Sequence, residues 1–215
     1  MKWVSALAVV VVGSSVASAQ LSYTFDSDAQ GWRRGNLDLA SLTLTDIGVA
    51  AWNASGFIEA DDFSDYAFHL SPSLGGVNMG NTYGGVLRLD FATVSASPAG
   101  PAQPFVVLTN GTGALFRPQS FADNTPLTTS VFSLDTTGGW QYGTSIANIA
   151  PATESQIRSI LGNLTRIGVT ADVADGTDST AVDNLRLVAP VPEPATIAAL
   201  GLGAVAILRR RRRAR

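Results

Sequence analysis

The side chains best suited to chemistry are four closely spaced aspartates in the segment ADVADGTDSTAVDN: Asp172, Asp175, Asp178 and Asp183. Hard cations such as Ca²⁺ need several oxygen ligands that converge from a turn, and Asp-Gly-Thr-Asp can form such a turn. The spacing differs from that of an EF-hand. The alternative is an ordinary turn in which the aspartates bond to local backbone groups. The four residues are therefore candidate ligands of a structural Ca²⁺, and the sequence indicates no other cofactor.

Other polar residues offer little support for catalysis. A second acidic group, formed by Glu59, Asp61, Asp62 and Asp65, is interpreted as a solvated loop. Glycoside hydrolysis needs two opposed carboxylates, and no motif singles out such a pair. The single histidine, His69, has no G-x-S-x-G motif to accompany it and is expected to be a half-exposed strand residue. The sequence therefore predicts a protein that is not an enzyme.

Aromatic side chains are the candidates for contact with a ligand. Tryptophan and tyrosine can stack on a sugar ring while their polar atoms stay hydrogen-bonded. Trp32 and Trp140 are assigned to the core, whereas Trp52 and Tyr66 are the candidate ligand-binding residues.

Charge is distributed unevenly along the 215 residues. Half of the 14 basic residues lie at the two ends of the chain, so the body between them is strongly acidic. Because nucleic-acid binding needs basic surface, a nucleic-acid partner is not expected. The chain has no cysteine, which excludes disulfides, thiol catalysis and zinc–thiolate sites.

Short apolar segments joined by turns predict a β-rich body. Leu87, Leu89 and Phe91 alternate with polar residues, as in a half-buried strand. The continuous apolar run 105–108 ends at Asn110-Gly111, a turn signal. The segments 21–25, 167–173 and 185–187 alternate in the same way, whereas 97–104 is expected to be a loop. Frequent strands with turn signals predict an all-β fold, most simply a jelly-roll β-sandwich.

One short helix interrupts the strands. Thr153 and Gln156 have the spacing of a capping box, and Gly162 stands where a helix would stop. Apolar residues at helical spacing follow the cap: Ile157, Ile160, Leu161 and Leu164. An amphipathic helix that packs on the sheets is therefore expected.

The N-terminus has the features of a secretory signal peptide. Lys2 precedes an apolar stretch from Val4 to Val12, and Ala17 and Ala19 form an A-x-A cleavage signal. Signal peptidase is expected to cleave before Gln20, which implies export.

The C-terminus combines a proline-rich motif, a short apolar stretch and a basic end. The motif comprises Val191, Pro192, Glu193 and Pro194; residues 195–208 are mostly apolar and 209–215 are rich in arginine. By the positive-inside rule, the arginines would stay in the cytoplasm. The whole layout resembles the PEP-CTERM sorting signal of exported bacterial proteins. That resemblance implies transient anchoring in the inner membrane and removal of the tail by an exosortase; a plain tail anchor is the alternative.

The body resembles a second family. The opening FD and GW pairs, the segment SPSLGGVNMGNTYGGVLRLDF and the closing LGNLTRIGVTADVADGTDSTAVDNLRL are similar to the laminin B domain (laminin type IV). The resemblance extends over residues 25–188. It implies a jelly roll of the galactose-binding-like kind, with a binding or structural role and no catalysis.

Together these features predict five regions: a signal peptide (1–19), a laminin-B-like β-sandwich (20–188), a linker with the PEP motif (189–194), a sorting helix (195–208) and a cytoplasmic tail (209–215). The expected protein is located at the cell surface or in the extracellular matrix and is a non-catalytic adhesion, matrix or carbohydrate-binding module. Its expected partner is an extracellular polysaccharide. A polysaccharide-active hydrolase on the same scaffold and a structural surface-layer subunit are the alternatives.

Overall fold

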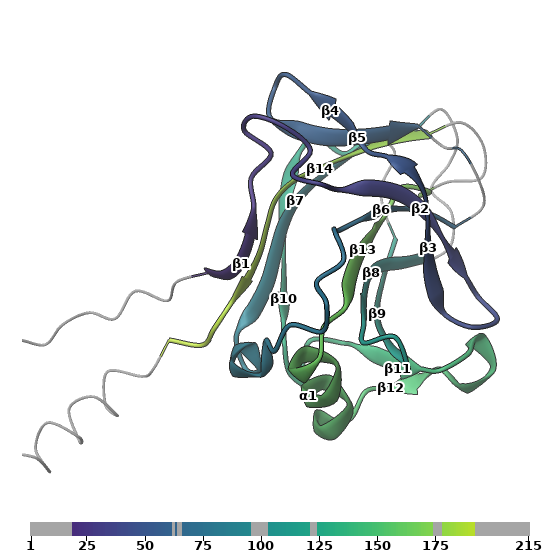
Figure 1. The fold of residues 1–215 in the computed structure, drawn as a ribbon, viewed down its shortest axis with the longest axis vertical. Coiled ribbons are helices and arrows are strands. Elements are labelled where there is room, and N and C mark those ends of the chain that lie inside the picture. Colours follow the sequence, from purple (N-terminus) through teal and green to yellow (C-terminus); the bar gives the residue numbers. More distant parts are fainter. Residues whose placement is uncertain are drawn as a thin grey trace, which may run out of the picture. The chain divides into compact units, whose positions relative to one another are not determined.

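A computed structural model describes residues 19–61, 63, 66–95, 103–120, 124–173 and 178–191. These residues form two antiparallel β-sheets and one α-helix, and residues Ser18–Pro190 make up one compact unit (Figure 1). The predicted signal peptide and the predicted helix 195–208 lie outside the described residues. Within the described residues, no helix is long and apolar enough to cross a membrane.

The six-stranded sheet is organised around its longest strand, β14. In sheet order the strands are β10 (Thr128–Ser133), β7 (Val86–Ser95), β14 (Asp178–Val188), β5 (Phe57–Asp61) and β4 (Ala51–Asn53), with β1 (Ala19–Tyr23) also paired to β14. β14 pairs with β7 along one edge and with β5 and then β1 along the other. The last strand of the domain therefore holds its first strand in place.

The eight-stranded sheet contains the remaining strands. Its order is β12 (Ala150–Pro151), β11 (Gln141–Gly143), β9 (Ala114–Gln119), β8 (Gln103–Thr109), β13 (Arg166–Thr170), β6 (Ala67–Leu70), β2 (Arg33–Asp38) and β3 (Thr43–Val49). The two sheets pack face to face, which confirms the predicted all-β sandwich with one short helix.

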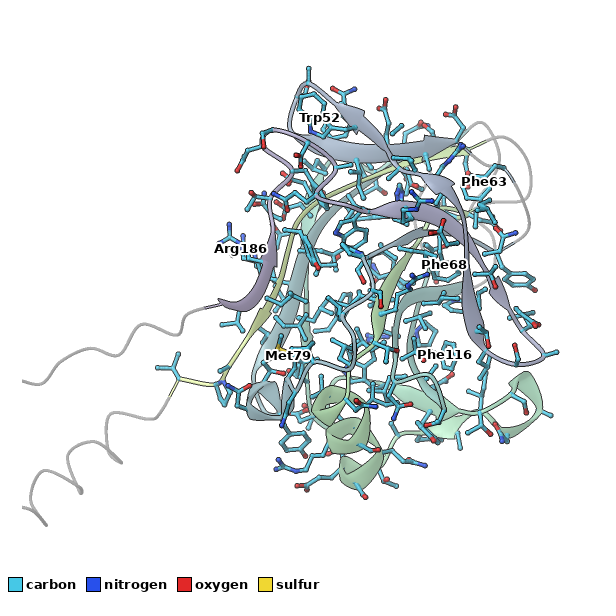
Figure 2. All side chains as sticks on the ribbon, viewed as in Figure 1. Trp52, Phe63, Phe68, Met79, Phe116 and Arg186 are labelled. Atoms are coloured by element: carbon cyan, nitrogen blue, oxygen red, sulfur yellow. The ribbon has the colours of Figure 1, made fainter. Side chains whose placement is uncertain are left out.

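The middle strands of the eight-stranded sheet are buried on both faces. Val106 and Leu108 of β8 point into the main core between the sheets, whereas Val107 joins a second apolar cluster on the opposite face. Leu37 of β2 and Leu44 of β3 belong to that second cluster, so the β2–β3 hairpin covers the outer face. Figure 2 shows the cluster members Phe68 and Phe116 on the side where this hairpin lies. The double burial explains why the run 105–108 is apolar without alternation.

Aromatic rings join the two sheets in the main core. Phe105 of β8 lies 4.8 Å from Phe91 and 5.7 Å from Phe132, between ring centroids, and both partners belong to the other sheet. Trp32 and Trp140 are buried, as predicted. The alternating strand residues at 87–91 and 167–173 also point inward as predicted.

The loop predicted at 97–104 differs in part from the structure. β8 begins at Gln103, and residues 96–102 lie outside the described residues. The predicted turn at Asn110-Gly111 is present: the Asn110 side-chain oxygen accepts hydrogen bonds from the backbone N–H groups of Thr112 and Gly113, both at 3.0 Å. Gly111 has a positive φ of 83°, a conformation that favours glycine.

The helix α1 (Glu154–Gly162) covers one end of the sandwich, near the 3₁₀ turn η1 (Gly80–Thr82); a second 3₁₀ turn, η2 (Ile146–Asn148), follows β11. The predicted capping box is present, since the Thr153 backbone N–H donates to Gln156 Oε1 at 2.9 Å and the Gln156 N–H donates to Thr153 Oγ1 at 3.4 Å. The predicted stripe of four apolar residues is fully buried. The helix ends at Gly162, as predicted.

The capping box gives a first testable prediction. Thr153→Ala leaves one backbone N–H at the helix N-terminus without its side-chain acceptor, so the free energy of unfolding should fall by about 0.5–2 kcal/mol. Urea denaturation measures the change. Ser159→Ala, at an exposed position within the same helix, is the control and should change stability by less than about 0.5 kcal/mol. Equal effects of the two substitutions would show that the cap contributes nothing specific.

Candidate functional site

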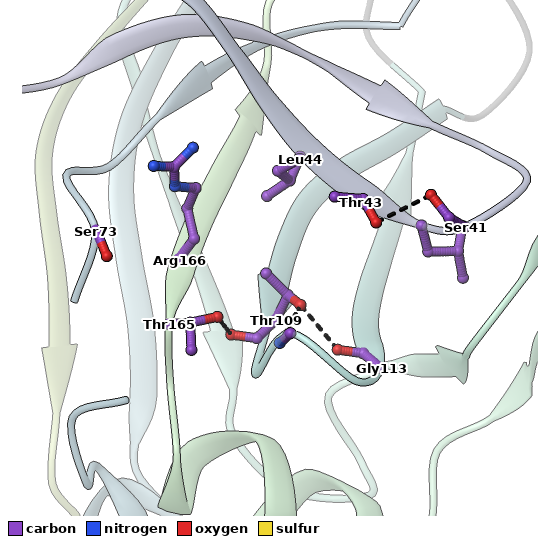
Figure 3. A pocket seen from close by; sticks show the side chains of 10 residues that line it. Ser41, Thr43, Leu44, Ser73, Thr109, Gly113, Thr165 and Arg166 are labelled. Carbon is purple, nitrogen blue, oxygen red and sulfur yellow. Dashed lines mark hydrogen bonds between the residues drawn. The ribbon is translucent and has the colours of Figure 1, made fainter. Parts of the chain in front are cut away.

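A polar cavity of about 310 Å³ lies on the side of the eight-stranded sheet that the β2–β3 hairpin covers. The tip of that hairpin, the β8–β9 turn and the start of β13 surround it (Figure 3). Its polar side chains are five hydroxyl groups and one guanidinium: Ser41, Thr43, Ser73, Thr109, Thr165 and Arg166. Leu42 and Leu44 supply apolar wall. This size is at the lower end of the range of small-molecule sites, and the lining is more polar than is usual for them.

Hydrogen bonds to the β8–β9 turn fix two of the hydroxyl groups. Thr109 Oγ1 donates to the Gly113 carbonyl at 2.9 Å and accepts from the Gly111 N–H at 3.0 Å. Thr165 Oγ1 donates to the Thr109 carbonyl at 2.9 Å (Figure 3). On the opposite wall, Ser41 Oγ lies 2.8 Å from Asp38 Oδ2 and 2.9 Å from Thr43 Oγ1. The hydroxyl groups are thus held in place before a ligand arrives.

Arg166 gives the cavity a positive charge. Within the part of the chain that the structure describes, its guanidinium makes no hydrogen bond and no ion pair. The nearby carboxylate of Asp46 is bound instead by Arg33, at 2.8 Å. The hydrogen bond from Arg33 is the main reason why the pKa of Asp46 is lowered, and the charge of Arg166 adds to the effect. None of the described residues that line the cavity carries a carboxylate.

A second cavity, of about 340 Å³, lies on the outer face of the six-stranded sheet. Small side chains of β7 and β14 form part of its lining, with Glu59, Asp61 and Leu127 beside them. The prediction that the acidic group is a loop is therefore wrong for Glu59 and Asp61, which belong to β5. Asp62 and Asp65 lie outside the described residues. The two carboxylates stand side by side on one strand face, so they do not oppose each other across a cleft.

The predicted Ca²⁺ ligands are placed as follows. Asp172 accepts a hydrogen bond from the Tyr66 N–H at 2.9 Å, and the buried Asp178 accepts one from the Val173 N–H at 2.7 Å. Asp183 lies further along β14 beside Asn184, and Asp175 is outside the described residues. Among the described residues, no three acidic, histidine or cysteine side chains form a group able to hold a metal. The Ca²⁺ site stays a prediction.

The two predicted ligand-binding aromatics lie apart, one on the six-stranded sheet and one just before a strand of the eight-stranded sheet. Trp52 is on β4, is 38% exposed and donates from Nε1 to the Phe25 carbonyl at 2.7 Å (Figure 2). Tyr66 precedes β6, has a positive φ of 60° and packs against the second apolar cluster. Neither side chain lines either cavity. Their role in binding also stays a prediction.

The prediction that His69 is half-exposed is wrong. Its side chain is completely buried between the sheets, where Nε2 lies 2.9 Å from Thr180 Oγ1 of β14. Burial lowers the pKa of His69 from 6.5 to about 3, so the imidazole is neutral at physiological pH. A substrate in solvent has no access to it. Because β6 is covered on both faces, its residues are all buried, which the four-residue segment itself does not reveal.

Comparison with known proteins assigns the fold to a family. Residues 76–200, more than half of the chain, match the family described as Laminin B (Domain IV). The chain belongs to the laminin B family. The match begins after β6, so the predicted resemblance at residues 25–75 is not part of it. No curated protein is significantly similar in sequence to the chain.

Solved structures extend the comparison of the laminin B domain. The L4b domain of human laminin alpha-2 is 15% identical, has a TM-score of 0.63 and covers 82% of this chain and 100% of that chain. This likeness shows a shared fold. A structure of botulinum neurotoxin type C is 9% identical and covers 77% of this chain and 50% of that chain, but its TM-score of 0.23 does not indicate a common fold.

The C-terminal residues give a separate match. Residues 190–213 match the PEP-CTERM protein-sorting motif, as the sequence predicts. With the laminin B domain, this motif points to an exported protein of the cell surface or extracellular space that is sorted by an exosortase. The laminin-like neighbours are non-enzymatic, which agrees with a non-catalytic role.

The sequence interpretation did not include the hydroxyl-lined cavity. Its residues come from four separate segments, and none of them forms a recognisable motif. The only local signal is that Thr109 precedes the Asn110-Gly111 turn and that Thr165-Arg166 begins a strand. Threonine beside a turn is too common to identify a site.

Proposed function

We propose that the laminin B domain is a non-catalytic module that binds an extracellular polysaccharide at the cell surface. The observation that carries the proposal is the cavity whose hydroxyl groups are fixed by the β8–β9 turn. Sugars present many hydroxyl groups that donate hydrogen bonds, and the Thr165 hydroxyl, whose own proton is donated to the Thr109 carbonyl, is still able to accept one.

The absence of carboxylates among the described lining residues supports binding without turnover. A glycosidase uses two carboxyl groups that flank the bond to be cleaved. Arg166 and hydroxyl groups cannot replace such a pair as acid and base. The domain therefore holds a saccharide and leaves its bonds intact.

The proposed route to the surface follows from the two ends of the chain. Signal peptidase cleaves between Ala19 and Gln20, and residues 195–208 anchor the protein transiently in the inner membrane. An exosortase then recognises Pro192-Glu193-Pro194 and removes the tail, since the match to the sorting motif includes these residues. The domain at 20–188 is thereby exposed to the extracellular matrix.

Filling the cavity tests the proposed function. Thr43→Trp places an indole at an exposed position of the cavity wall, so binding to polysaccharide extracted from the producing bacterium should fall by at least about 10-fold, as expected for blocked access to a ligand site. The full chain, expressed in cells with an exosortase, is purified in its mature form, and its affinity is measured by calorimetry. Thr128→Trp is the control, because Thr128 is an exposed strand residue of the other sheet.

Further outcomes distinguish the proposed function from three alternatives: binding at another site, hydrolysis and self-assembly. Unchanged binding by Thr43→Trp, or an equal loss in Thr128→Trp, would exclude this cavity as the site. Release of reducing ends would identify a hydrolase, and self-assembly without any saccharide would identify a structural surface-layer subunit. Denaturation curves of both variants check that the fold is retained.

A further inference from the structure

Arg166 distinguishes this cavity from a site for neutral sugars. We infer that the cavity selects acidic saccharides, with Arg166 binding the anionic group of a uronic acid or sulfated sugar unit. This inference rests on the proposed function and names the class of polysaccharide. It predicts that charge on the polymer contributes directly to affinity.

The position of Arg166 supports this role. It is the first residue of β13, pairs with Thr109 of β8 in the sheet, and extends its side chain between Ser73 and Leu44 (Figure 3). Backbone hydrogen bonds hold both neighbouring segments: the Thr165 N–H donates to the Thr109 carbonyl, and the Leu74 N–H donates to the Thr165 carbonyl, both at 2.8 Å. The base of the side chain is therefore set by the sheet and does not depend on a mobile surface loop.

The charge of Arg166 is available to a ligand. Asp46, whose carboxylate feels the charge of Arg166, is already bound by Arg33 at 2.8 Å, and the described part of the chain contains no hydrogen bond or ion pair to the Arg166 guanidinium. A guanidinium binds a carboxylate or sulfate with two parallel N–H···O bonds. The Thr165 hydroxyl lies in the same cavity and can accept a hydrogen bond from the sugar that carries the anionic group.

The surrounding charge makes the contact selective. The body of the protein is acidic, so a polyanion is repelled from most of its surface and gains little from non-specific attraction. The second cavity carries Glu59 and Asp61, which disfavour an anionic ligand. Of the two cavities, the one that contains Arg166 is therefore the one suited to an acidic polymer.

Matched polymers and matched variants test the inference. Polygalacturonate and its fully methyl-esterified form share one backbone and differ in charge, and dextran sulfate tests whether a sulfate replaces the carboxylate. For the mature protein, purified after expression of the full chain, we expect tighter binding to polygalacturonate than to the methyl ester. Arg166→Gln should weaken polygalacturonate binding by about 10- to 100-fold, which corresponds to the loss of a charge-assisted hydrogen-bonded pair, and should weaken binding of the ester far less. Arg166→Lys should recover part of the loss, because lysine keeps the charge without the planar fork.

Arg88→Gln is the control, because it removes the same charge from an exposed position on β7. Equal affinity for the acidic and esterified polymers, or equal losses in Arg166→Gln and Arg88→Gln, would overturn the acidic specificity and leave the proposed saccharide binding intact. If the protein binds neither these polymers nor the native polysaccharide, both the acidic specificity and the proposed saccharide binding are overturned. Thermal denaturation of Arg166→Gln confirms that any loss is not due to unfolding.

Discussion

Replacing Phe105 with alanine should lower the free energy of unfolding by about 3–5 kcal/mol. The ring is fully buried on β8 and contacts Phe91 and Phe132 of the opposite sheet in edge-to-face arrangements. Alanine removes the apolar surface that joins the two sheets and leaves a cavity, because strands paired on both sides cannot move inward to fill it. Urea denaturation followed by tryptophan fluorescence measures the loss.

Val131→Ala provides the matched comparison for this substitution. Val131 lies on β10, next to Phe132, but its side chain is 55% exposed on the outer face. Its removal should cost less than about 1 kcal/mol. If both substitutions cost the same, aromatic packing between the sheets is not what stabilises the sandwich.

Lowering the pH from 7 to 5 should reduce the free energy of unfolding by about 2 kcal/mol through His69 alone. Burial lowers the pKa of His69 in the folded state to about 3, whereas the unfolded chain has an ordinary pKa near 6.5. Between these two values the unfolded state binds the extra proton, so stability is lost as the pH falls below about 6.5. Above pH 7 both states are neutral at this site, and it makes no pH-dependent contribution.

The test of this dependence uses the fact that His69 is the single histidine of the chain. In the double variant with His69→Leu and Thr180→Val, both partners of the buried hydrogen bond are replaced by apolar groups of similar size, so no polar atom of the pair is left unsatisfied. Its stability should fall far less between pH 7 and pH 5 than that of the wild-type protein. If this variant loses as much stability as the wild-type protein, or if the wild-type protein loses none, the pH dependence is not due to His69. Carboxylates with lowered pKa, such as Asp38 and Asp46, titrate below this range.

The local sequence determined much of the fold. Alternation at Leu87, Leu89 and Phe91 predicts the inward face of β7, because side chains of a strand point to opposite faces in turn. The capping box at Thr153 and Gln156 predicts the start of α1, since the partners are only three residues apart. The proline-rich motif and the segments that resemble the laminin B domain predict the two family matches. These features depend on neighbours in the chain or on long patterns of residues similar to those of a known family, and both can be recognised without a structure.

The tertiary structure alone decided where the candidate site lies. The cavity exists because the β2–β3 hairpin covers the outer face of the eight-stranded sheet and brings Ser41 and Thr43 opposite Thr109, Thr165 and Arg166. Sheet order also places His69 next to Thr180 and buries it, although the sequence predicts a half-exposed strand residue. Both results depend on which strands pair and which face is covered. Those choices are set by packing between distant segments, and no local pattern of residues encodes them.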